Sequence, residues 1–312
     1  MYTIEEIKII NAQRPEPPLV QRVRDRLTKY FGSLEFEPAE HRYFVSSQGA
    51  RRELPSMSSV IDRFVPQVDW EAKAAGVAAR TGSTKEAVLR SWNENKIRAA
   101  NNGTSTHLYG EAWMHFALGH PERIDPVIRP QMEEGYLIPY SPKQEAVMKF
   151  WEDVMKDPTL FPVAAECRIH SLYVKGVKDH FAGTFDALFL KIHQDGRPAL
   201  VLKDYKTNAE MRKSYARNHG QTLYPPFQDI VDDPEGHYTL QQSGYSMALA
   251  SVGLRVESRD LVWLKNDGTY EEIRLPSIEE RMRSALSGEN VEVDIDGLMK
   301  AMGQEINHLG KK

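Results

Sequence analysis

Residues 183–206 read GTFDALFLKIHQDGRPALVLKDYK, and this stretch decides the expected fold. Two apolar runs, residues 184–190 and 199–205, flank a polar segment that contains the turn signal Asp195-Gly196. Apolar runs joined by such a turn are typical of a β-hairpin. We therefore expect two antiparallel strands, most of whose side chains are buried.

Three charged residues interrupt this apolar hairpin. Side chains alternate along a strand, so Asp204 and Lys206 share one face, and Asp186 is expected opposite Asp204 or Tyr205. Two close carboxylates repel each other, and burial of an unpaired charge is costly. A divalent cation such as Mg²⁺ or Mn²⁺ removes the conflict, because it takes carboxylate oxygens as ligands. The lysine would then orient or deprotonate a water; the alternative is an edge hairpin with a surface ion pair.

Composition limits the classes of protein that need to be considered. The 312 residues are 41% hydrophobic and 27% charged, which is ordinary for a globular protein of one large domain. No apolar run approaches the roughly 18 residues of a membrane-spanning helix. The acidic N-terminus, MYTIEEIKII, lacks the features of a signal or transit peptide. We expect no membrane association and a cytoplasmic location, in a host cytoplasm if a phage encodes the chain.

Cysteine usage and charge add further limits. The only cysteine is Cys167, which excludes an intramolecular disulfide, an iron–sulfur cluster held by cysteines and a zinc ribbon. The net charge is −4, so a nucleic-acid-binding protein with this composition needs a local basic surface. Residues 203–217 are one candidate, since their five Lys and Arg against two acids give +3; the alternative is a solvated loop.

Hydrophobic patterning divides the chain into three parts. Residues 1–32 are predicted to be a helical appendage, residues 33–275 the main α/β domain, and residues 276–312 two C-terminal helices packed on that domain. Within the main domain, the 161–173 segment, the central hairpin and a second hairpin over 256–275 predict a mixed β-sheet flanked by helices.

Two helices are expected over residues 84–100 and 104–118, with a stop at Asn101-Asn102-Gly103 between them. His107 and Glu111 then share a face of the second helix, near its N-terminal turn, where a phosphate is favoured. The alternative for His107 and Glu111 is a surface pair. Glu166 stands in the apolar stretch PVAAECRI, either beside a metal or as the partner of Arg168.

Residues 208–238 form the longest stretch without periodicity, and a loop of this length is usually functional or disordered. A clear helix over residues 239–252 follows, with Gln241 and Tyr245 on one face.

The order of these motifs is more informative than any one of them. The chain presents G-T-x-x-H-x-x-x-E (residues 103–111), G-T-F-D (183–186), D-Y-K-T (204–207) and Q-x-x-x-Y (241–245). This succession resembles the RecB-like branch of the PD-(D/E)xK nuclease superfamily, in particular its stand-alone phage exonucleases and the mitochondrial genome-maintenance exonuclease. The resemblance covers residues 103–275 and implies a restriction-endonuclease-like core.

The resemblance also implies roles for individual residues. Asp186 and Asp204 would be carboxylate ligands of one or two Mg²⁺ or Mn²⁺ ions, with the backbone carbonyl of Tyr205 as a further ligand. Lys206 would be the catalytic lysine, and His107 would contact a metal or a phosphate. Supporting or DNA-binding positions would be Glu111, Thr207, Gln241 and Tyr245, to which the basic segment adds Arg212 and Lys213.

These observations lead to one expected function and to two alternatives. The expected function is a metal-dependent deoxyribonuclease, an exonuclease rather than a site-specific endonuclease, which processes DNA ends in recombination, repair or phage DNA metabolism. Phe185 replaces the proline of the family motif, and no nucleotide-binding G-x-x-x-x-G-K-[ST] motif is present, so a helicase or single-strand annealing protein would act in trans. The alternatives are a non-catalytic DNA-binding protein on a nuclease-like fold and an enzyme acting on a small phosphoester.

Overall fold

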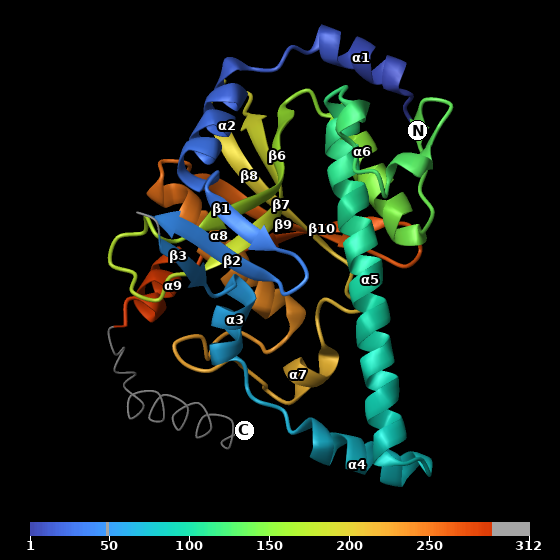
Figure 1. Ribbon diagram of the computed structural model, residues 1–312, viewed down its shortest axis with the longest axis vertical. Coiled ribbons are helices and arrows are strands. Elements are labelled where there is room, and N and C mark those ends of the chain that lie inside the picture. Colours follow the sequence, from blue (N-terminus) through green and yellow to red (C-terminus); the bar gives the residue numbers. More distant parts are fainter. Residues whose placement is uncertain (48–49, 289–312) are drawn as a thin grey trace, which may run out of the picture.

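A computed structural model of the chain describes residues 1–47 and 50–288. The described chain is an α/β structure with a five-stranded mixed sheet at its centre (Figure 1). The strand order is β10-β9-β8-β7-β6, and every neighbouring pair is antiparallel except β8 with β9. The bounds of these strands are β6 Leu160–His170, β7 Ala182–Ile192, β8 Pro198–Lys206, β9 Val256–Leu264 and β10 Tyr270–Leu275.

Both expected hairpins are confirmed. Strands β7 and β8 pair from Ala187 opposite Lys203 to Ile192 opposite Pro198, around the turn that contains Gly196. The pairing of the two strands stops just before Asp186 and Asp204, which are the next residues in register, at the point where the strands separate. Strand β6 pairs with β7 and forms one edge of the sheet.

The helices pack on both faces of this sheet. The α-helices are α1 Ile4–Gln13, α2 Pro18–Phe31, α3 Met57–Ile61, α4 Trp70–Thr81, α5 Lys85–Ala117, α6 Pro142–Lys156, α7 Ser214–Asn218, α8 Pro234–Ser251 and α9 Glu279–Leu286. Short 3₁₀ turns cover Asp62–Phe64, Pro121–Arg123 and Arg129–Gln131. Two small sheets complete the fold: β1 Leu34–Glu37, β2 Arg42–Ser47 and β3 Ala50–Leu54 form one, and β4 Met132–Glu133 and β5 Tyr136–Leu137 form the other.

Two large apolar cores lie on opposite faces of the sheet. Helices α5 and α6 contribute Trp113 and Trp151 to one core, together with Phe189 of β7. Helices α2, α8 and α9 share the other core with side chains such as Leu188 of β7. The alternation of Leu188 and Phe189 between the two cores shows that the hairpin is buried on both faces, as its continuous apolar runs require.

The first 32 residues are helical, as predicted, and they contribute directly to both cores. Val20, Val23 and Leu27 of α2 belong to the core that contains α8, and Ile7 of α1 belongs to the core that contains α5. The C-terminal segment forms α9 as expected, whereas the second helix predicted there, over residues 295–309, lies outside the described residues.

The predicted helix stop at Asn101-Asn102-Gly103 is wrong. Helix α5 continues through these residues and spans 33 residues (Figure 1). A glycine inside a helix costs only about 1 kcal/mol relative to alanine, which the buried C-terminal part of α5 easily offsets. His107 therefore lies inside a continuous helix, and the helix N-terminal turn that we expected to favour a phosphate beside it does not exist.

Candidate metal centre

The site is built where β7 and β8 separate. Asp186 is the last residue of β7 before the paired segment, and its Oδ2 accepts a hydrogen bond from the backbone N–H of Tyr205 at 2.5 Å. Asp186 and Asp204 are both buried, with 6% and 2% of their surface exposed. The backbone N–H of Tyr205 thus fixes the position of the Asp186 carboxylate. The other carboxylate, that of Asp204, belongs to strand β8 itself.

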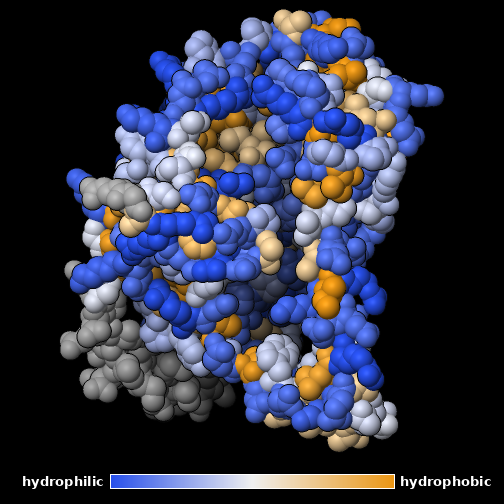
Figure 2. All heavy atoms as spheres, viewed as in Figure 1, coloured by the Kyte–Doolittle hydropathy of each residue, from blue (hydrophilic) through white to orange (hydrophobic). Residues whose placement is uncertain are grey.

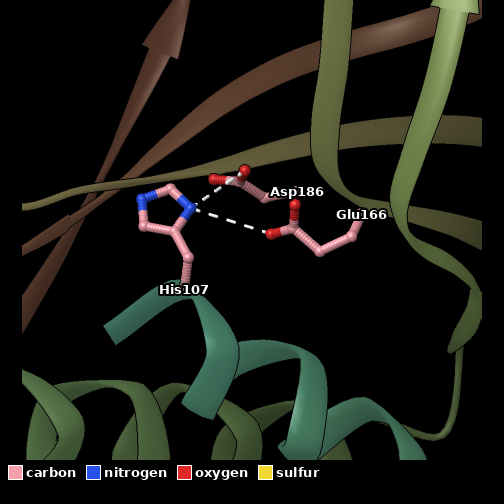
Figure 3. A group of neighbouring side chains, drawn as sticks. All are labelled: His107, Glu166 and Asp186. Atoms are coloured by element: carbon pink, nitrogen blue, oxygen red, sulfur yellow. Dashed lines mark hydrogen bonds and ion pairs between the residues drawn. The ribbon is translucent and has the colours of Figure 1, made fainter. Parts of the chain in front are cut away.

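Helix α5 and strand β6 complete a group of three potential metal ligands: His107, Glu166 and Asp186 (Figure 3). His107 Nδ1 lies 3.1 Å from Asp186 Oδ1 and 3.8 Å from Glu166 Oε1. One ligand atom from each residue lies within 4.8 Å of the others. In Figure 3 the imidazole of His107 rises from the helix, and one of its ring nitrogens faces both carboxylates.

Glu166 reaches the site through an unusual backbone. Its neighbours Ala165 and Cys167 pair with Ala187 and Phe185, so Glu166 stands at the level of Asp186. Its φ angle is 44°, which a non-glycine residue rarely adopts and which marks a locally strained position. Of the two alternatives for Glu166, the geometry matches the position beside the candidate metal ligands. No ion pair joins it to Arg168 within residues 50–288.

Lys206 lies on the other side of Asp204. Its ammonium forms an ion pair with Asp204 Oδ2, lies 3.3 Å from Gln241 Oε1 and sits 4.1 Å from the ring centre of Tyr238. Gln241 also donates to the hydroxyl of Tyr245 at 3.4 Å. The Q-x-x-x-Y motif therefore contacts the lysine from helix α8.

Electrostatics at this site is dominated by burial and by close charges. Burial, together with the charge of Asp186, raises the pKa of Glu166 to about 7 and that of Asp204 to about 6. Burial works against the charged form of His107, but Asp186 and Glu166 outweigh it and raise the His107 pKa to about 10. The pKa of Lys206 is likewise raised, because Asp204 outweighs burial. The acids thus create a field that favours cations.

The residues present fit a hard divalent cation. Two carboxylates and an imidazole offer the oxygen and nitrogen ligands that Mg²⁺ and Mn²⁺ accept. Glu166 Oε1 is buried and accepts no hydrogen bond, which is costly unless another partner satisfies it. Asp204 stands outside the group of three, paired with Lys206, and the peptide of Tyr205 lies beside Asp186.

The other residues predicted to support the site or to bind DNA are not among the three candidate metal ligands. Glu111 follows His107 by one helical turn, and burial raises its pKa. Thr207 follows β8, and its Oγ1 approaches the position that a Cβ on Gly103 would occupy to 3.6 Å. Arg212 is exposed and paired with Glu235, and Lys213 is exposed beside it, at the start of α7.

The expected basic surface over residues 203–217 is largely neutralised. Lys203 is only 4% exposed and forms ion pairs with Asp260 and Glu272, so it adds nothing to the surface. Arg212 pairs with Glu235, and Arg217 pairs with Asp233. A count along the sequence could not foresee these pairs, because the acids come from other strands and from helix α8.

Two residues that hold the site in place, Tyr238 and Lys143, were not predicted from the sequence. Tyr238 precedes Gln241 and Tyr245 by three and seven positions, so helical spacing alone could have placed it on their face. Lys143 donates to the backbone carbonyls of Thr207 and Leu264 at 2.9 and 2.7 Å, and thereby ties together the ends of β8 and β9. No sequence pattern indicated this role.

Comparisons with known proteins add no assignment. No protein-family model matches the chain, and a search of curated proteins found no relative. Within residues 1–47 and 50–288, no helix is both long and apolar enough to cross a membrane.

Proposed function

We propose that the protein is a metal-dependent deoxyribonuclease that hydrolyses phosphodiester bonds from DNA ends. The observation that carries this proposal is the convergence of Asp186, Asp204 and Lys206 with Glu166 and His107 at one end of the central hairpin. Five charged side chains from four elements meet there. Structural ion pairs do not require such a costly concentration of buried acids.

The finer fold proposed is the restriction-endonuclease-like core of the PD-(D/E)xK nucleases. Support comes from the mixed sheet with its central hairpin, from α5 packed against one face and from α8 beside the lysine. The motif order G-T-F-D, D-Y-K-T and Q-x-x-x-Y maps onto β7, β8 and α8 in this arrangement.

The residues have distinct roles in the proposed reaction. Asp186, Glu166 and His107 would hold Mg²⁺ or Mn²⁺, with Asp204 and the backbone carbonyl of Tyr205 as further candidates. Such an ion supplies positive charge that acidifies a water and stabilises charge on a phosphate. Lys206 lies within reach of Asp204, where its ammonium can orient the attacking water and offset negative charge that develops on the phosphate. Gln241 and Tyr238 fix the position of this ammonium.

The direct test uses two DNA substrates with Mg²⁺, Mn²⁺ or EDTA: an end-labelled linear duplex and a covalently closed circle. Loss of the linear DNA alone, abolished by EDTA, is expected for an exonuclease. Cutting of the circle would replace this proposal with a structure-specific endonuclease. Binding of DNA without cleavage under every condition would indicate a non-catalytic DNA-binding protein instead.

The variant Asp204→Asn is the matched test of mechanism, because it keeps the shape of the side chain and removes its charge. We expect its cleavage rate to fall at least about 100-fold, as for the loss of a central electrostatic group. Cleavage at the wild-type rate would contradict the proposed site. A helicase or annealing protein acting in trans would change the overall process but not this result.

A further inference from the structure

A pocket of about 760 Å³ lies where the end of α8, the start of β9 and the first turns of α9 meet. The loop that follows β6 adds Tyr173 and Lys175 to its lining. The hollow that Figure 2 shows between the positions of α2 and α5 in Figure 1 has an apolar floor. The pocket at α9, in contrast, is lined mainly by charged and polar side chains, and the proposed function assigns no role to it.

This pocket lies away from the candidate metal centre. Strands β8 and β9 are parallel, and the first residue of β9, Val256, is aligned with Leu200. Leu200 precedes Lys206 by six residues, which span about 20 Å of extended strand. Arg255 of the pocket directly precedes Val256, so it lies near the end of β8 that is opposite to the metal centre. A ligand held there would be separate from the candidate metal ligands.

Cations outnumber acids in the lining of the pocket. The cationic residues are Lys175, Arg255, Arg259, Arg281 and Arg283, and the acidic ones are Glu279 and Glu280. Three of the cations form ion pairs: Arg259 with Glu279, Arg281 with Asp229 and Arg283 with Glu280. Lys175 and Arg255 are exposed, and within residues 1–47 and 50–288 their side chains form no ion pair, hydrogen bond or ring contact. The pocket therefore keeps two positive charges that can bind an anion.

Arg259 is a buried cation in the wall of the same pocket. It is only 6% exposed, and its Nη1 donates to Ser246 Oγ at 3.2 Å and to Glu279 Oε1 at 3.0 Å. Its Nε is buried and has no hydrogen-bond partner among the described residues, which is costly for a charged group. Burial also lowers the pKa of Arg259. An anion in the pocket would compensate both effects.

Helix α9 and Tyr173 indicate the size and kind of this anion. The helix begins beside the pocket at Ile278 without a side-chain cap, so the N–H groups of its first turn are available to an anion. Tyr173 is 46% exposed and offers an aromatic ring on the wall. The volume lies within the range of about 300–1,000 Å³ that is typical of pockets for small organic ligands. An aromatic ring beside several cations matches a phosphate that is joined to a flat ring.

We propose that this pocket binds a mononucleotide. Its phosphate is bound by Arg255, Lys175 and the buried Arg259, and its base lies against the ring of Tyr173. Free phosphate shares the first of these two contacts, so the test has to distinguish the two ligands. The proposal does not depend on the proposed nuclease function, because no residue of the candidate metal centre takes part in it.

Calorimetry on the full chain tests this proposal with three probes: deoxyadenosine 5′-monophosphate (dAMP), sodium phosphate and deoxyadenosine. EDTA is present and the ionic strength is constant, so that no metal can hold a nucleotide at the candidate metal centre. The variants Arg255→Gln and Lys175→Gln each remove one unpaired cation, and Tyr173→Leu removes the ring, which Tyr173→Phe keeps. The control, Arg22→Gln, removes an exposed arginine of α2 outside the lining.

We expect dAMP to bind more tightly than phosphate, and deoxyadenosine to bind most weakly. Arg255→Gln and Lys175→Gln should each weaken dAMP binding about tenfold, the equivalent of one charge-assisted contact, while Arg22→Gln changes it less than twofold. Tyr173→Leu should weaken the binding of dAMP and leave that of phosphate unchanged, and Tyr173→Phe should bind both as the wild type does.

Three outcomes would overturn the proposal. If phosphate bound as tightly as dAMP and Tyr173→Leu changed neither, the ligand would be free phosphate and not a nucleotide. Equal losses in Arg22→Gln and in the two pocket variants, or no binding of dAMP, would reject the pocket. Displacement of dAMP by a short DNA duplex at a lower concentration than by unlabelled dAMP would assign these cations to a DNA contact. None of these measurements requires cleavage, so they stand or fall independently of the nuclease.

Discussion

Lys206 is the residue whose charge the proposed chemistry uses most directly. Its ammonium is held by Asp204 and Gln241, and the side chain of Lys206 is only 12% exposed, so bulk water has little access to these contacts. We expect Lys206→Gln to lower the cleavage rate by about 10²–10⁴-fold, the usual contribution of a group that acts on protons in the transition state. Metal binding should survive, because the lysine is not a ligand. The control is Lys191→Ala, which removes a lysine from the far end of β7.

Tyr238 is predicted to be a positioning residue for this lysine. Its ring lies 4.1 Å from the ammonium, and its hydroxyl donates to Asn208 Oδ1 at 2.8 Å. The variant Tyr238→Leu should lower kcat about tenfold with little change in KM, because a cation–π contact is worth about 0.5–2 kcal/mol. Tyr238→Phe keeps the ring and should retain most of the activity. A purely structural role would instead lower the melting temperature of both variants without separating their kcat values.

At the scale of elements, helix α5 contains two glycines whose surroundings in the fold differ. Its two glycines, Gly103 and Gly110, are seven residues apart and so lie on nearly the same face. A Cβ on Gly110 would lie 2.5 Å from the ring of Tyr205, whereas one on Gly103 would be 3.6 Å from its nearest neighbour. The first glycine is therefore tolerated by the helix, and the second is required by the packing.

This contrast gives a matched pair of stability predictions. Gly110→Ala should lower the free energy of unfolding by about 1–3 kcal/mol, because the added methyl overpacks a buried aromatic contact. Gly103→Ala should raise it by about 0.5–1 kcal/mol through the better helix propensity of alanine. Urea unfolding of both variants measures these changes. The same sign for both would contradict the packing described for Tyr205.

Sequence alone predicted the elements that depend on local signals. The hairpin β7–β8 carries its own turn and its own apolar pattern, and both were sufficient to place Asp186 near Asp204. The helix stop at Asn101-Asn102-Gly103 was wrong because tertiary packing of α5 outweighs three weak helix formers. The positive φ angle of Glu166 depends on its place in the edge strand of the sheet, and no sequence pattern predicted it.

At the scale of the whole molecule, the sheet brings together acids that are far apart in the chain. His107, Glu166 and Asp186 come from one helix and two strands. Lys203 is buried, and it forms ion pairs with the buried Asp260 and the exposed Glu272. Long-range pairings of this kind determine which charges face solvent and which face the site. Composition and motif order carry no information about them, which explains why the sequence could not show that several basic residues of the candidate surface over residues 203–217 are paired with acids.

A metal ion bound at the proposed centre should stabilise the whole fold. A ligand that binds only the native state stabilises it by about 2.7 kcal/mol at 100 times its dissociation constant. Mg²⁺ or Mn²⁺ should therefore raise the melting temperature by several degrees, since each kcal/mol shifts it by about 2–4 °C in large domains. EDTA should reverse the shift.

The variant Glu166→Gln tests whether this stabilisation comes from the proposed centre. Glu166 Oε1 accepts no hydrogen bond, and Asp186 repels its charge, so the amide should leave the melting temperature in EDTA unchanged or slightly higher. The metal-induced shift should shrink by at least half, because one of three ligands is gone. The control, Glu94→Gln, removes an exposed acid of α5 and should keep the full shift. If Glu166→Gln kept it too, the ion would bind elsewhere, since a carboxylate that holds a metal cannot be replaced by an amide without a loss of affinity.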